Sequence, residues 1–88
     1  MTRAEIAKSL KPLEWDIWEG GKYRFANIAE AYEAMVMSKD DGNFLVKINK
    51  RGVIDSYMCT TVTTIQEADA IVREWQIDHI CSYFQMNN

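Results

Sequence analysis

Apolar positions at the end of the chain follow the spacing of a helix that packs one side on a core. Between Thr64 and Gln85 the apolar and aromatic positions that recur at intervals of three and four are Ile65, Ala68, Ile71, Val72, Trp75, His79 and Tyr83. This spacing predicts a long helix with one buried stripe. Thr64 is a typical N-cap residue, and Glu67 three positions later completes a capping box. The rest of the chain is therefore expected to supply the surface on which this stripe packs.

A second, shorter helix is predicted at the start of the chain. Thr2 and Glu5 repeat the capping-box spacing, and the apolar residues as far as Leu10 fit one helical face. Pro12 ends this helix, because the residue before a proline is pushed toward extended geometry.

Between the two helices, apolar and polar residues alternate, as they do in strands with one buried side. The strand-like stretches cover residues 13–17, 22–28, 44–48 and 53–62. The turns between them are marked by glycine, asparagine and aspartate at residues 20–21, 40–43 and 49–52. These turns are short, so we expect neighbouring strands to pair antiparallel.

The segment Ala29–Ser38 is ambiguous. Its alanine, glutamate and methionine residues favour a helix by intrinsic propensity, whereas its place before the turn at Asp40–Asn43 favours a strand that pairs with Phe44–Ile48. We interpret it as a strand and keep the helix as the alternative. The whole pattern predicts one domain, residues 1–88, of the α+β class: a small antiparallel β-meander of three to five strands packed against the long C-terminal helix, with a short N-terminal helix.

The end of the long helix carries a second apolar surface. Four side chains lie outside the main stripe, on an arc roughly opposite to it: Ile77, Ile80, Cys81 and Phe84. In one interpretation the N-terminal helix, through Ile6 and Leu10, or Trp18 covers this arc within the chain. In the other, the arc is a partner surface, in a homodimer or in a complex with another protein, and Trp18 is a neighbouring anchor.

Composition narrows the classes of function. Eighty-eight residues, of which 48% are hydrophobic, suffice for one core. No apolar run approaches the roughly 20 residues that span a bilayer. The two cysteines, Cys59 and Cys81, are expected as buried or half-buried free thiols in a reducing compartment. We therefore expect a cytoplasmic protein with no membrane segment.

No stretch carries a catalytic or metal-binding signature. His79, the only histidine, falls on the core stripe, and Cys81 two residues later lies on a different side of the helix, which disfavours a shared zinc site. Gly20, Gly21 and Gly42 precede strands rather than helices, so no phosphate-binding loop is predicted. We expect a non-enzymatic protein that uses no cofactor and no metal.

One local cluster of basic residues lies at a predicted hairpin tip and consists of Lys47, Lys50 and Arg51. Such a hairpin can contact a phosphate backbone, although charged turns are usually only solvated. The net charge of −3 argues against a general nucleic-acid binder, because such proteins usually carry a concentrated basic face. Nucleic-acid binding through this hairpin is therefore the alternative function.

Three segments resemble a group of small uncharacterised proteins encoded in phage and prophage genomes: LKPLEW at Leu10–Trp15, DDGNFLVKIN at Asp40–Asn49 and TIQEADAIVREWQIDHI at Thr64–Ile80. In that group a PLEW near the start precedes a short meander, and a T-x-E-A helix closes the chain. Here one more residue separates the threonine from Glu-Ala. The resemblance implies an intracellular, phage-related origin, with no known activity and no site residues to carry over. The second apolar arc, the acidic C-terminal helix and the absence of a chemical signature make a small protein-binding module the leading functional hypothesis. The resemblance gives its narrower form, a phage-encoded inhibitor of a host or defence protein.

Overall fold

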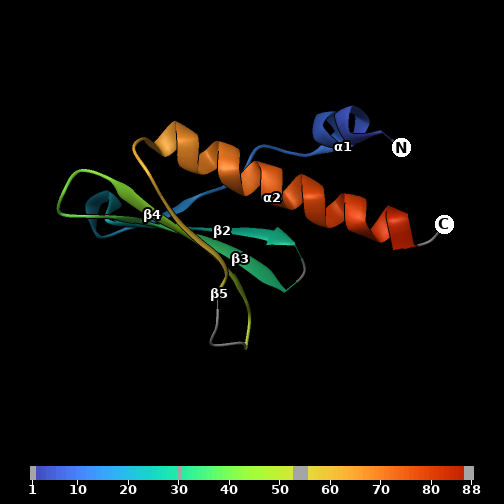
Figure 1. Ribbon diagram of the computed structural model, residues 1–88. Helices are drawn as coiled ribbons and strands as arrows, with labels where there is room; N and C mark the ends of the chain where they lie inside the picture. Colours follow the sequence, from blue (N-terminus) through green and yellow to red (C-terminus); the bar gives the residue numbers. More distant parts are fainter. Residues whose placement is uncertain (1, 30, 53–55, 87–88) are drawn as a thin grey trace.

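The computed structural model describes residues 2–29, 31–52 and 56–86 (Figure 1). The elements, in chain order, are α1 (Arg3–Ser9), β1 (Asp16–Trp18), the 3-10 turn η1 (Glu19–Gly21), β2 (Tyr23–Ala29), β3 (Tyr32–Ser38), β4 (Phe44–Lys50), β5 (Ser56–Val62) and α2 (Ile65–Met86). The first residues of the last predicted strand, Val53 to Asp55, lie outside the described residues.

Both predicted helix starts are confirmed. The Thr2 hydroxyl accepts a hydrogen bond from the Glu5 amide at 3.2 Å, and the Glu5 carboxylate accepts one from the Thr2 amide at 3.4 Å. At α2 the Thr64 hydroxyl accepts from the Glu67 amide at 3.0 Å, whereas the Glu67 carboxylate accepts from the Thr63 hydroxyl at 2.6 Å. The capping box of α2 is therefore extended by one residue toward the preceding strand.

The strands form one antiparallel sheet in the order β1-β2-β3-β4-β5, so each strand pairs with its neighbour in sequence. The ambiguous segment is a strand: in β3, Ala34 pairs with Ala26 of β2 and with Ile48 of β4. Pairing on both sides outweighs the helical propensity of its residues, because propensity is weak compared with burial and sheet hydrogen bonds. The predicted α+β meander is confirmed, with five strands.

The first strand differs from its prediction. β1 covers only Asp16–Trp18, so Leu13 and Trp15 precede it, and Trp18, one residue beyond the predicted stretch 13–17, belongs to it. Leu13 and Trp15 instead pack against the core, and the Trp15 indole donates a hydrogen bond to the Asp69 carboxylate of α2 at 3.0 Å. The segment before β1 is thus held by the helix rather than by the sheet.

The core lies between one face of the sheet and α2. Its buried side chains are Ile28, Ala34, Val36, Val46, Ile48, Val62, Ala68 and Val72. Ala68 and Val72 belong to the stripe predicted from the helical spacing, and Ile65, Ile71 and Trp75 of the same stripe pack against this core in part. Figure 1 shows α1 and α2 on the same side of the sheet, with α1 packed against α2. Within the described residues, no helix covers the opposite face of the sheet.

The two isoleucines at β4 and β1 provide a test of this core. Ile48 is 0% exposed and Ile17 is 54% exposed, so Ile48→Ala should lower the free energy of unfolding by about 2–5 kcal/mol because it leaves a cavity. The matched change Ile17→Ala should cost less than about 0.5 kcal/mol. Urea denaturation of both variants measures the difference. Equal losses would contradict the burial of Ile48 in the core and the exposure of Ile17 at the edge of the sheet.

Candidate functional site

The second apolar arc of α2 is covered in part by α1. Ile77 is 4% exposed and Ile6 of α1 is 2% exposed, and neither belongs to the core between α2 and the sheet. The Arg3 guanidinium of α1 forms ion pairs with Glu74 and Asp78, which flank Ile77 on α2. Hydrogen bonds with Asp78 and Glu74 raise the pKa of Arg3 above its usual range, so this link stays charged. α2 therefore packs on both the sheet and α1.

This arrangement corrects part of the predicted partner surface. Ile77 is buried within the chain, as the interpretation with the N-terminal helix as a cover requires. Ile80 and Cys81 are half-buried, and the side chain of Phe84 lies outside the described part of the chain. Trp18 is no neighbour of this arc, because it pairs with Tyr23 on the face of the sheet that points away from α2. The sequence did not reveal that the sheet separates the two.

The face of the sheet opposite to α2 carries its own apolar surface, which we call the open face. Cross-strand pairing places one row of side chains from Trp18 through Tyr23 and Met37 to Leu45, and a second row from Asp16 through Phe25, Met35 and Lys47 to Cys59. The apolar residues of the open face are Trp18, Tyr23, Phe25, Met35, Met37 and Leu45. All but Trp18 are half-buried, although no described helix covers them. An uncovered apolar surface of this kind is typical of an interaction site.

A sequence signal for the open face exists in the strands themselves. Met35 and Met37 alternate with Ala34 and Val36, and Leu45 precedes Val46, so β3 and β4 are apolar on both sides. A strand that packs on only one side usually alternates apolar with polar residues. The strands were predicted correctly, but the second apolar side was not interpreted as a site.

Trp18 is the most exposed aromatic anchor of the open face. Its side chain is 56% exposed, and its indole N–H donates a hydrogen bond to the Asp16 carboxylate at 3.0 Å. Tyr23 lies opposite Trp18 on the neighbouring strand, and the Lys22 ammonium lies 5.6 Å from the centre of the Tyr23 ring. The hydrogen bond orients the indole in the free protein, so less conformational entropy is lost when it is buried by a partner.

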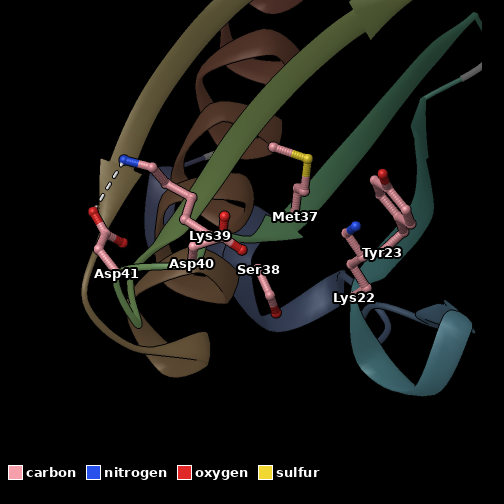
Figure 2. A pocket seen from close by; sticks show the side chains of 7 residues that line it. All are labelled: Lys22, Tyr23, Met37, Ser38, Lys39, Asp40 and Asp41. Atoms are coloured by element: carbon pink, nitrogen blue, oxygen red, sulfur yellow. Dashed lines mark ion pairs between the residues drawn. The ribbon is translucent and has the colours of Figure 1, made fainter.

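A polar depression borders one end of the open face (Figure 2). This pocket of about 470 Å³ is lined by Lys22, Tyr23, Met37, Ser38, Lys39, Asp40 and Asp41. Its backbone is fixed by Ser38, whose amide donates to the Lys22 carbonyl at 2.8 Å and whose hydroxyl donates to the Gly21 carbonyl at 3.3 Å. The open face therefore has a polar rim with both signs of charge, as protein interfaces commonly do.

The predicted basic cluster is divided between the two faces of the sheet. Lys47 lies on the open face between Met35 and Cys59, whereas the Lys50 ammonium lies on the helix side, 5.9 Å from the centre of the Tyr32 ring. The Arg51 guanidinium donates a hydrogen bond to the side-chain Oδ1 of Asn27 at 2.6 Å. Because positions 47 and 50 of a strand point to opposite sides, the three side chains form no single basic patch.

The histidine and the two cysteines, which the sequence offered as possible metal ligands, lie in separate environments. The His79 ring stacks on Trp75 at 5.0 Å and meets Tyr32 edge-on at 4.7 Å. Both cysteines are free thiols; Cys81 is half-buried as predicted, but Cys59, on the edge strand β5, is exposed. In the described ranges no three His, Cys, Asp or Glu side chains gather as metal ligands.

Neither α1 nor α2, the helices of the described chain, is both long and apolar enough to cross a bilayer. The fold is that of a small α+β protein whose five-stranded meander is covered on one face by helices. Comparison with protein-family models, with curated proteins and with solved structures finds no match for the chain.

Ile77 offers a test of the contact between α1 and α2. Ile77→Glu should lower the free energy of unfolding by at least about 3 kcal/mol, because it places an uncompensated carboxylate in a buried contact. Ala70→Glu adds the same charge at an exposed position of α2 and should change stability little. Circular dichroism during urea denaturation measures both. A wild-type transition for Ile77→Glu would show that α1 does not cover this position in solution.

The turn at the rim of the open face should respond to pH. The Asn43 amide donates a hydrogen bond to the Asp41 carboxylate at 3.0 Å, and this bond, followed by the attraction of Lys39, lowers the pKa of Asp41. Because the folded pKa is the lower one, the stabilisation is complete above the unfolded pKa and is lost as pH falls through the folded pKa. The amide proton shift of Asn43 should therefore titrate in acid.

Asp41→Asn is the control for this titration, because the side chain keeps an acceptor oxygen but loses its charge. In that variant the Asn43 shift should stay flat over the same pH range. A flat profile in the wild-type protein would show that the turn does not depend on the ionised carboxylate.

Proposed function

We propose that this chain is a non-enzymatic module that binds another protein through the open face of its sheet. The observation that carries the proposal is the exposed, hydrogen-bonded Trp18 beside an uncovered row of apolar residues. Tryptophan is among the residue types that contribute most to binding at protein interfaces. The polar rim around Lys39 and Asp41 supports the same interpretation, since protein interfaces commonly combine an apolar centre with a polar rim.

The size of the open face favours a separate partner protein over an obligate homodimer. Five strands spaced about 4.8 Å apart, four of seven residues and β1 of three, at about 3.3 Å per residue, give a face of at most about 19 by 23 Å. Obligate dimers usually bury about 2,000 Å² or more in total, counting both subunits. Two copies of the open face, one from each subunit, would bury less than this. The open face fits a smaller, heterologous contact in which a few anchors such as Trp18 carry most of the affinity.

Nucleic-acid binding through Lys47, Lys50 and Arg51 gains no support from this arrangement. The three residues lie on different sides of the sheet, and the Arg51 guanidinium is already hydrogen-bonded to Asn27. A phosphate backbone is usually followed by cations on one continuous surface. The resemblance to phage proteins suggests a narrower form of the proposal, in which the partner is a host or defence protein and binding inhibits it.

The experiment is a pull-down from a bacterial host lysate with wild-type and Trp18→Ala protein as parallel baits. One protein should be retained by the wild type after nuclease treatment and lost with Trp18→Ala, since truncation of a tryptophan that anchors an interface costs about 2 kcal/mol or more, or about 30-fold in affinity. Mass spectrometry then identifies it. Both baits should have the same melting temperature, because Trp18 lies outside the core.

Ile17→Ala is the matched control bait, because Ile17 is also exposed and lies next to Trp18 on β1 but on the helix side of the sheet. It should retain the partner. Equal retention by Trp18→Ala would contradict the open face as the docking surface. Retention that disappears with nuclease would favour nucleic-acid binding, and recovery of the bait alone as a dimer would replace the heterologous partner by a second copy.

A further inference from the structure

The helix side of the protein contains a pocket that the proposed docking surface does not use. It has a volume of about 640 Å³ and opens where α2 passes the turn between β2 and β3. Leu10, Tyr32, Lys50, Gln76, His79 and Ile80 are among the residues that line it. Pockets of roughly 300–1,000 Å³ with apolar walls and a few polar groups are typical of small-molecule sites. The size and lining therefore fit a small ligand better than a macromolecule.

The pocket contains one cation and, in its described lining, no carboxylate. Lys50 lies at the end of β4 with its ammonium 5.9 Å from the centre of the Tyr32 ring. Within the part of the chain that the structure describes, Lys50 forms no ion pair. The described lining of the pocket therefore carries a net positive charge. A pocket with a net positive charge selects an anionic group.

The walls around Lys50 are held in place by the protein itself. The Gln76 side-chain Nε2 donates to the Ile28 backbone carbonyl at 2.8 Å, and its Oε1 accepts from the Arg73 guanidinium at 2.9 Å. The rings of Tyr32 and His79 meet edge-on at 4.7 Å, and Trp75 supports His79 from behind by stacking at 5.0 Å. Because the protein's own side chains make these contacts, little reorganisation is needed when an apolar group enters.

We propose that this pocket binds a small amphipathic carboxylate. Its charged group pairs with the Lys50 ammonium, and its apolar body lies against Tyr32 and the aliphatic side chains of Leu10 and Ile80. A carboxylate satisfies the ammonium by charge-assisted hydrogen bonds, and the apolar body removes the aliphatic walls from water. This proposal is independent of the open face, because the pocket lies on the other side of the sheet.

The test uses octanoate as the probe and the complete chain as the protein, with methyl resonances as the readout. Titration below the micelle-forming concentration should give saturable shifts of the Ala29, Ala31 and Ile80 methyl groups, which line the pocket. The methyl groups of Met35 and Met37 on the open face should stay unchanged. Octylammonium, which has the same chain length and the opposite charge, should give no saturable shifts, because Lys50 repels it.

Lys50→Met removes the charge with little change in side-chain length and should weaken octanoate binding about tenfold. Lys50→Arg keeps the charge and should bind octanoate with similar affinity. Lys47→Met is the matched control, because Lys47 lies on the same strand but on the open face. Equal binding of octanoate and octylammonium, an unchanged affinity in a folded Lys50→Met protein, or shifts confined to Met35 and Met37 would each overturn the proposal.

Discussion

The structure depends on the contact between the apolar stripe of α2 and one face of the sheet. Ala68 and Val72 meet the central strands where Val46 and Ile48 are completely buried. A five-stranded meander has two faces, and here both carry apolar side chains. The chain provides helices for only one of them. The uncovered face is therefore a direct consequence of how the apolar residues and the helices are distributed.

The two sides of α2 explain why the helix itself is not the exposed surface. Its second apolar side begins at Ile77 and is used for packing against α1, with Arg3 linked to the carboxylates on both sides of Ile77. A short helix such as α1 gains most of its stability from packing rather than from its own propensity. Covering Ile77 thus stabilises α1 and buries the part of α2 that would otherwise be open to a partner.

Local patterns in the sequence were sufficient to predict the helices and strands but not to locate the candidate site. The cap residues Thr2 and Thr64 and the alternation in β2 and β4 depend on neighbours within a few positions, and these predictions are confirmed. The covering of Ile77 by α1 depends on two segments that are far apart in the sequence. The same holds for Trp18, because the strand pattern alone does not tell which side of the sheet the helix occupies. The location of the site therefore depends on contacts between segments that are far apart in the sequence, which local patterns do not reveal.

Strand parity also separates the two candidate sites. Lys47 and Lys50 are three positions apart on β4, so one faces the flat apolar surface with Trp18 and the other faces the pocket beside His79. A flat face rimmed by polar groups suits a protein surface, whereas a concave site with one cation suits a small anion. The sheet alone separates the open face from the pocket, and its central residues Val46 and Ile48 are fully buried. The same strand therefore positions two cations in different chemical environments, and one basic cluster in the sequence becomes two unrelated surfaces.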